Sequence, residues 1–367
     1  MTEQRPERSP GLPAWLAGLL AVALAAGVSL ERARAAEAPA AAPPPAAAPV
    51  YTPTSLKAER GLPRTRDGHP DFQEVVWEAN FFAPLEMMQP KLAPTLVLPE
   101  DQARKASRAL ISSFLDNPLF KSLIALDPEF EGILNDSKGF PIVRGERRSR
   151  LLVLPADGKL PLTPQGAKQG QVSLAALMGK TDNPEERGNL ERCVSMGATP
   201  PVTFLGGPNP REFVLTRDYV AIHSESGDEV RIIPFTDQHG SRGPRPAFGD
   251  SIARWEGDTL VIETTSLPAS ERRRFSPTGS YVVNPDAKVI ERFTRLSRDE
   301  LLYQFTVEDP KIYASPWLGE YSFFRASYRM FPGNCHEGNY GLPNILAGAR
   351  EEERARAAAA TTAVAAK

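Results

Sequence analysis

Residues 249–267 read GDSIARWEGDTLVIETTSL, and this stretch decides the predicted fold. Apolar and polar side chains alternate over residues 251–255 and again over 259–265, with Gly257 and Asp258 between the two runs. A period of two is typical of half-buried strands, and Gly-Asp between two such runs is typical of a hairpin turn. The stretch therefore predicts two antiparallel strands joined tightly.

The same alternation recurs on both sides of this hairpin. A second short polar turn is expected at residues 296–300. Closing a run of antiparallel strands into a barrel removes the exposed edges. We therefore expect a mainly β fold, an antiparallel meander closing into a lipocalin-like barrel, with strands at 213–216, 219–224, 229–235, 251–255, 259–265, 289–295, 301–308 and 321–330.

The chain before this region is richer in proline and less regular. Residues 99–115 predict a helix, because apolar side chains recur at helical spacing after Pro99. Shorter helices are expected at 119–126 and after Thr163. We expect an irregular and helical region at 55–200 packing on a β domain at 201–350, followed by an Ala-rich tail at 351–367.

The N-terminal segment has the pattern of an export signal. An uncharged apolar run at 12–30 is followed by ARAA at 33–36, with small residues at the positions that signal peptidase reads. We interpret residues 1–35 as a cleaved signal peptide and 36–54 as a Pro/Ala linker; a retained membrane anchor is the alternative. The expected location is the periplasm or the medium.

Composition narrows the class of protein. Of 367 residues, 41% are hydrophobic, which excludes wholesale disorder. The formal net charge of −2 gives no reason to expect nucleic acid, or an anionic membrane after signal cleavage, as a partner. Nothing in the sequence indicates a cofactor. The oligomeric state and partner proteins stay open.

Cys193 and Cys335 are the two cysteines of the chain. In an oxidising compartment such a pair is expected to form one disulfide. The rival reading, a nucleophilic cysteine, lacks a recognisable motif around either residue.

Several segments resemble a family. DGHPDF (67–72), PLTPQG (161–166), RWEGDTLV (254–261) and CHEGNYG (335–341) are similar to segments of a large family of secreted bacterial proteins without a settled activity. The resemblance covers most of residues 62–353 and fits less well at 85–150. It implies export and a shared fold, and it implies no reaction.

CHEGNYG is the sharpest local candidate for a site. His336 beside Glu337, with the phenol of Tyr340 close by in sequence, is a combination suited to acid–base chemistry near neutral pH. The alternative is a structural corner whose polar groups satisfy loop backbone.

Charged residues among apolar ones on strand faces form a second group of candidates. Glu263, Glu291 and Arg231 each share a strand face with apolar neighbours, and Arg254 lies nearby. An unpaired charge inside a barrel is costly, so we expect Arg231 or Arg254 to meet Glu263 or Glu291. The pair is either a structural ion-pair network or the lining of a site.

The remaining candidates concern ligands. His223 is placed on a strand and is a ligand-binding candidate; a metal site with Glu225 would need His239 or His336 to converge on it. Trp255 and Trp317 either line an apolar cavity or belong to plain core. GDS at 249–251 resembles a hydrolase nucleophile motif but lacks the downstream Asp-x-x-His.

Three functions follow from this reading. The first is a carrier that binds a small organic molecule in the barrel cavity. The second is a cofactor-independent lyase, isomerase or hydrolase, with His336 as acid–base and Glu263, Glu291 and Arg231 positioning the substrate. The third is a structural envelope protein.

Overall fold

The stretch 249–267 forms the predicted hairpin. Strand β9 (Asp250–Glu256) pairs antiparallel with β10 (Thr259–Thr265), and Gly257 occupies the turn at a φ of 60°. Glycine adopts this left-handed backbone without strain.

The computed structural model describes residues 58–116, 138–170, 181–187, 192–195, 197–202, 209–240, 246–269, 273–276, 279–333 and 335–365.

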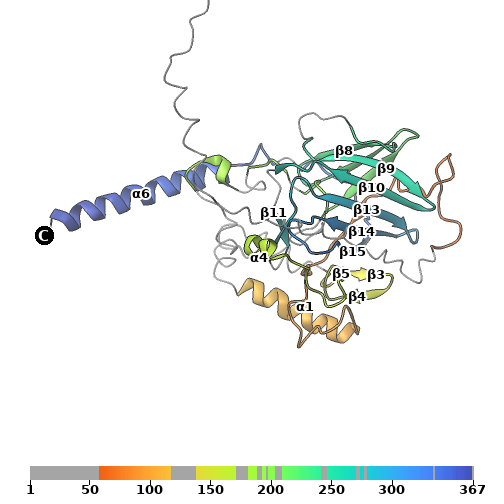
Figure 1. Cartoon of the computed structure of the whole chain (residues 1–367), viewed down its shortest axis with the longest axis horizontal. Helices are drawn as coiled ribbons and strands as arrows, with labels where there is room; N and C mark the ends of the chain where they lie inside the picture. The colour runs from red at the N-terminus through yellow and green to blue at the C-terminus, as the bar shows by residue number, and fades with distance from the viewer. Residues whose placement is uncertain are drawn as a thin grey trace, which may run out of the picture. The chain divides into compact units, whose positions relative to one another are not determined.

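The hairpin belongs to a ten-stranded antiparallel sheet (Figure 1). The other strands are β1 (Trp77–Glu78), β5 (Leu152–Leu154), β6 (Arg211–Leu215), β7 (Tyr219–Ser224), β8 (Glu229–Pro234), β13 (Lys288–Arg295), β14 (Glu300–Glu308) and β15 (Trp317–Arg325). The ladders run in the order β8, β7, β6, β1, β15, β14, β13, β10 and β9, and β5 pairs with β15 beside this path. The mainly β, antiparallel fold is confirmed.

The sheet is not a simple meander of consecutive strands. The two-residue strand β1 lies between β6 and β15: Trp77 pairs with Arg211 on one side and with Arg325 on the other. The region at 55–200 therefore contributes strands to the sheet. A further hairpin, β11 (Arg273–Ser276) with β12 (Gly279–Val282), interrupts the chain between β10 and β13.

Closure into a barrel is not shown. Strands β8 and β9 end the ladder, and in the described residues one isolated parallel bridge joins Phe235 to Ala253 across the gap between these edges. Side chains nonetheless cross that gap. From β8, Arg231 reaches Ser251 in β9 and Thr264 in β10. The sheet is therefore strongly curved.

The concave side of the sheet holds the core. Large aromatic side chains fill it and contact one another: Phe293 lies against Tyr303 with the rings tilted (centroids 4.9 Å apart), and Tyr303 lies edge to face against Tyr321 (5.1 Å). Aromatic pairs at such distances add to the stability gained from their burial. The largest fully buried side chains include Trp77, Trp317, Phe293, Phe305 and Phe323.

A small sheet covers part of the convex side. It consists of β2 (Val97–Leu98), β4 (Glu146–Arg148) and β3 (Ile142–Val143). The buried carboxylate of Glu320 in β15 fixes it, accepting Arg144 at 3.3 Å and Arg148 at 3.2 Å. A buried carboxylate needs such pairing, because desolvation of an unpaired charge is expensive.

The helices match the predictions where these can be compared. Helix α1 (Glu100–Leu115) starts after Pro99 and buries Ala103, Ala106 and Leu110. Helix α4 (Pro164–Gly170) is capped by Thr163, whose hydroxyl accepts the Gly166 N–H at 3.0 Å. A 3-10 turn spans Pro184–Glu186, and α6 (Gly341–Ala365) covers the expected tail.

Three predictions fall outside the described residues: the helix at 119–126, the signal segment at 1–35 and the linker at 36–54. Among the helices of the described part, none combines the length and apolar character needed to cross a membrane.

Candidate functional site

The sheet interior contains the predicted ion pair. Arg231 in β8 donates from both terminal nitrogens to Glu291 in β13, at 3.2 and 2.7 Å, and the Glu291 side chain is 0% exposed. The expected meeting of Arg231 with Glu291 is confirmed. A bidentate guanidinium–carboxylate pair of this kind holds both groups in one geometry.

Hydrogen bonds extend this pair through the core. The Tyr303 hydroxyl donates to Glu291 at 2.9 Å and accepts the Val202 N–H at 3.0 Å, while Tyr321 donates to the Val202 carbonyl at 3.0 Å. Burial, and then the charge of Glu291, raise the pKa of Tyr303 well above its ordinary value. Both phenols therefore stay neutral and act as hydrogen-bond donors.

This interior network is enclosed by aromatic side chains. Glu291, Tyr303 and Tyr321 are fully buried, and each of their hydroxyl or carboxylate groups contacts protein. The arrangement ties the segment around Val202 to the sheet. It accounts for these charged and polar residues without a ligand.

Glu263 lies on the opposite face of β10 from the interior pair. It meets His239, whose Nε2 is 3.4 Å from its Oε1, and the other ring nitrogen of His239 is 3.3 Å from Asp250. The expectation that Glu263 points inward is therefore wrong. Strand β10 is buried on both faces in its middle, with Val261 and Ile262 both 0% exposed, so alternation alone does not identify the inner face.

The CHEGNYG segment lies at the surface. His336, Glu337 and Tyr340 are exposed, and no side-chain hydrogen bond or ion pair of His336 or Glu337 occurs within the described part of the chain. Glu291 is enclosed by Arg231 and Tyr303. The structure therefore does not bring His336 and Glu337 together with Glu291.

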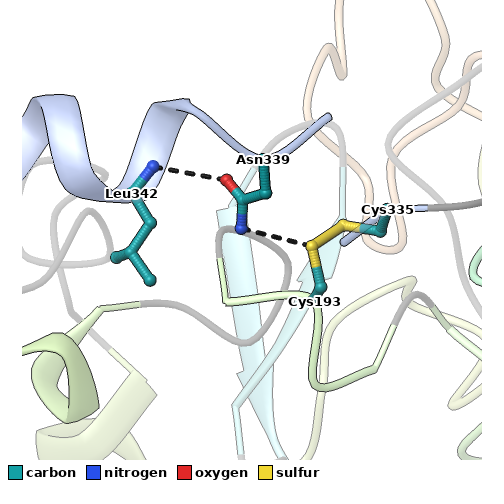
Figure 2. The surroundings of a disulfide bond; sticks show 4 residues. All are labelled: Cys193, Cys335, Asn339 and Leu342. Carbon is teal, nitrogen blue, oxygen red and sulfur yellow. Dashed lines mark hydrogen bonds between the residues drawn. A yellow bond between two sulfur atoms is a disulfide. The ribbon is translucent and has the colours of Figure 1, made fainter. Parts of the chain in front are cut away.

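The disulfide between Cys193 and Cys335 is confirmed. The two residues lie 142 positions apart in sequence with Cα atoms 5.6 Å apart. Figure 2 shows Asn339 beside it, donating to the Cys193 sulfur at 3.3 Å and accepting the Leu342 N–H at 3.3 Å. The bridge joins the loop before β6 to the chain just ahead of α6.

Next to this bridge lies a groove on the convex side of the sheet. Its volume is about 660 Å³, within the range of small-molecule sites. One wall is the outer face of β6 and β7, and the other is the segment after β15. The groove, called the His223 groove below, is lined by Glu74, Val75, Val76, Glu212, His223, Asp228 and residues 325–332.

His223 and Asp228 form a dyad in this groove. The Nε2 atom of His223 is 2.7 Å from Oδ1 of Asp228, and Asp228 sits in the β7–β8 turn at a φ of 51°. In the neutral imidazole this contact places the proton on Nε2 and leaves Nδ1 as the basic nitrogen. A carboxylate that orients an imidazole in this way is the usual support of a general base.

Four further charged side chains line the same groove. Arg325 and Arg329 come from the wall after β15, and Glu74 and Glu212 come from the opposite side. Within the described residues, none of these four side chains makes an ion pair or side-chain hydrogen bond. Both signs of charge are therefore available to a ligand.

The wall after β15 is fixed in place by its backbone. The Phe331 N–H donates to the Glu225 carboxylate at 2.8 Å, and Gly333 forms a parallel bridge with Ser226. A Cβ on Gly333 would lie 2.0 Å from the Glu225 carbonyl oxygen, so only glycine fits this approach. Cys335 then fastens the end of the wall to Cys193.

Three other predicted ligand-binding residues lie outside the groove. Arg254 is exposed and pairs with Glu256 at 2.7 Å. Trp255 stacks on His69 with ring centroids 4.4 Å apart, and Trp317 is buried against other aromatic residues of the core. Their contacts are structural.

Sequence reasoning found His223 and missed its partners. Asp228 follows a glycine in a turn, and Arg325 and Arg329 belong to FFRASYRMF, for which the sequence predicts a strand up to residue 330. The strand ends at Arg325 instead. A change from mainly apolar to mixed side chains at Arg325 is the sequence signal that could have separated the strand from the groove wall that follows it.

Metal coordination finds no support in this arrangement. His223 is engaged by Asp228, Glu225 accepts the Phe331 N–H, and His239 lies between Asp250 and Glu263. In the described ranges no cluster of three or more His, Cys, Asp or Glu residues is suited to hold an ion.

Comparison of the chain with protein-family models, with curated proteins and with solved structures finds no match.

Proposed function

We propose that this protein binds a small organic molecule in the His223 groove. The observation that carries the proposal is the convergence there of the His223–Asp228 dyad with two guanidinium groups that have no partner in the described part of the chain. The sheet interior, which the sequence favours, is occupied by aromatic side chains and by the hydrogen-bonded residues Arg231, Glu291 and Tyr303. The groove is open to solvent and needs no rearrangement to admit a ligand.

Binding of the dye anilinonaphthalene sulfonate tests this proposal. The dye joins an anionic group to apolar rings, and the groove offers Arg325 and Arg329 beside the exposed Phe331. Fluorescence titration should show binding that weakens about tenfold or more in R325M/R329M, since charge-assisted hydrogen bonds are lost.

The matched control is R60M/R66M. It removes two exposed arginines outside the groove, so the net charge changes equally. If both double variants bind the dye as the unchanged protein does, binding in the groove is refuted.

A second function is favoured by the dyad itself. With Nε2 held by Asp228 at 2.7 Å, His223 is set to accept a proton from water at Nδ1 while that water attacks the acyl carbon of an ester. The acyl C–O bond then breaks, and the alcohol leaves as the imidazolium returns the proton. Hydrolysis of p-nitrophenyl acetate measures this activity. H223Q should lower the rate about a hundredfold, and H239Q should not; equal rates in all three proteins would rule out hydrolysis by His223.

The finer shape of the fold is also part of the proposal. We infer that β8 and β9 approach each other so that the sheet curls into a barrel of lipocalin-like shape. The Phe235–Ala253 bridge and the reach of Arg231 from β8 to β10 support this. Hydrogen exchange checks it: slow exchange is expected along both facing edges, and fast exchange along them would contradict closure.

Export to the periplasm or the medium completes the proposal. A disulfide is stable in such oxidising compartments and rare in the cytosol. Fractionation of the producing cells, with thiol labelling of each fraction, tests the location. Labelled thiols on cytosolic protein would count against it.

A further inference from the structure

The outer face of β6, β7 and β8 continues the His223 groove as an apolar surface. Strand register places Glu212, His223 and Val230 side by side in one row, and Val214, Ala221 and Ile232 in the next. Val214 is 53% exposed and Ile232 is 68% exposed. Neighbouring residues in such rows lie about 5 Å apart, so the two rows form one continuous surface.

The opposite wall of the groove, formed by the segment after β15, also exposes apolar side chains. Phe331 is 70% exposed, and Tyr328 beside it is partly exposed. The Tyr328 hydroxyl donates to Glu78 at 2.8 Å, which fixes its ring in the wall. A large exposed apolar surface rimmed by charges marks an interaction site on a soluble protein.

The charges specify what the apolar surface receives. Among the described residues, Arg325 and Arg329 have no anionic partner and Glu74 and Glu212 have no cationic one, while Asp228 is already engaged by His223. A purely anionic ligand would leave the two glutamates unmatched, and a purely cationic one would leave the two arginines unmatched. A ligand that carries both charges matches all four.

We infer that the His223 groove takes a short apolar peptide with a free ammonium and a free carboxylate end; this rests on the proposed function. The carboxylate pairs with Arg325 and Arg329, and the ammonium pairs with Glu212 and Glu74. Apolar side chains lie on Phe331, Val230 and the Val214–Ile232 row. The groove volume of about 660 Å³ suits a ligand of two or three residues.

Calorimetric titration of the unchanged protein with trileucine tests the inference. Trileucine should bind, whereas its N-acetyl form and its C-terminal amide should each bind about tenfold more weakly, since each loses one charge-assisted contact. Because this comparison needs no variant, it does not depend on how a substitution affects folding.

Two variants then assign each end of the peptide. R325M/R329M should remove the preference for trileucine over its amide and keep the preference over the N-acetyl form. E74Q/E212Q should do the reverse. Loss of both preferences in either variant would overturn the assignment of the ends.

The outcomes separate this inference from the function on which it rests. If the dye binds in the groove but trileucine does not bind, or if both blocked peptides bind as well as trileucine, the peptide inference fails and the proposed function stands. If neither the dye nor any peptide binds, both fail.

Discussion

Arg231 spans the concave side of the sheet from β8 to β13 and places both terminal nitrogens on the Glu291 carboxylate, at 3.2 and 2.7 Å. Both side chains are almost completely buried. Forming such a pair changes the stability little, whereas removing one of its partners lowers the stability strongly. The attraction roughly balances the cost of removing two charges from water, but one charge left alone has no compensation.

Removing one partner of this pair should therefore destabilise the protein strongly. Glu291→Ala leaves the Arg231 guanidinium buried without its carboxylate, and we expect a loss of about 3–5 kcal/mol in the free energy of unfolding. Urea unfolding followed by tryptophan fluorescence measures it. The double variant R231M/E291L should recover most of the loss, and a double variant no more stable than the single one would contradict this account.

Loss of the disulfide should also lower stability. The bridge closes a segment of 142 residues, for which the chain-entropy model gives about 5 kcal/mol as an upper value. We expect C193S/C335S to lose about 3–5 kcal/mol, with dye binding in the groove weakened as well. The same result is expected from the unchanged protein under reductant, and unaltered stability in both cases would show that the bridge is dispensable.

The Arg64–Asp258 pair should make a small, pH-dependent contribution. The hydrogen bond from Arg64 lowers the pKa of Asp258, against the opposing effect of burial. A lowered folded-state pKa gives stability that is present above the unfolded value, near 4, and is lost as pH falls through the folded value. Both side chains are about half exposed, so solvent screens the pair and we expect only a small contribution.

Unfolding of D258N at two pH values measures this term. The variant should be less stable than the unchanged protein at about pH 7, and this deficit should shrink at about pH 2, as pH falls toward and through the lowered folded-state pKa. D67N serves as the control, since Asp67 is exposed and makes no ion pair within the described residues. A D258N deficit that persists at the lower pH would show that the contribution is not electrostatic.

Gly333 should be essential for the groove wall. Its Cβ position lies 2.0 Å from the Glu225 carbonyl oxygen, so G333A must displace the wall from the β7–β8 turn. We expect weakened dye binding together with a loss of about 1–3 kcal/mol, as for other overpacked sites. G338A is the matched control, because a Cβ there meets nothing within 4 Å. Equal binding by the two variants would argue against a fixed wall.

Strands that are buried on one face could be located from sequence. The bounds of β7 and β10 agree with the alternating runs, and the Arg231–Glu291 pair followed from charges placed among apolar residues on one strand face. The strand predicted at 321–330 lies four or five residues later than β15 (Trp317–Arg325). The prediction misses its start because residues 317–323 are buried on both faces and show no alternation. Strand β1 has two residues, too few for any period to be visible.

The groove could be predicted only in part, because its two walls come from segments that are distant in sequence and meet only in the folded protein. His223 was recognised as a rare residue on a strand, but Arg325 and Arg329 reach it only because the chain after β15 folds back over the β7–β8 turn. That return depends on one glycine contact and on the bridge to Cys193. Neither spacing nor composition near His223 carries this information.

Strand β1 has a consequence for the order in which the molecule is assembled. It is the first strand of the sheet in the chain, yet it pairs with the last, β15, and it is the link between β6 and β15 in the ladder. Until residues 317–325 have left the ribosome, Trp77 has no Arg325 to pair with, and no strand ladder runs from β6 through β1 to β14. Folding therefore awaits almost the whole polypeptide, and a shortened chain starting at Pro201 would lack the piece that joins those halves.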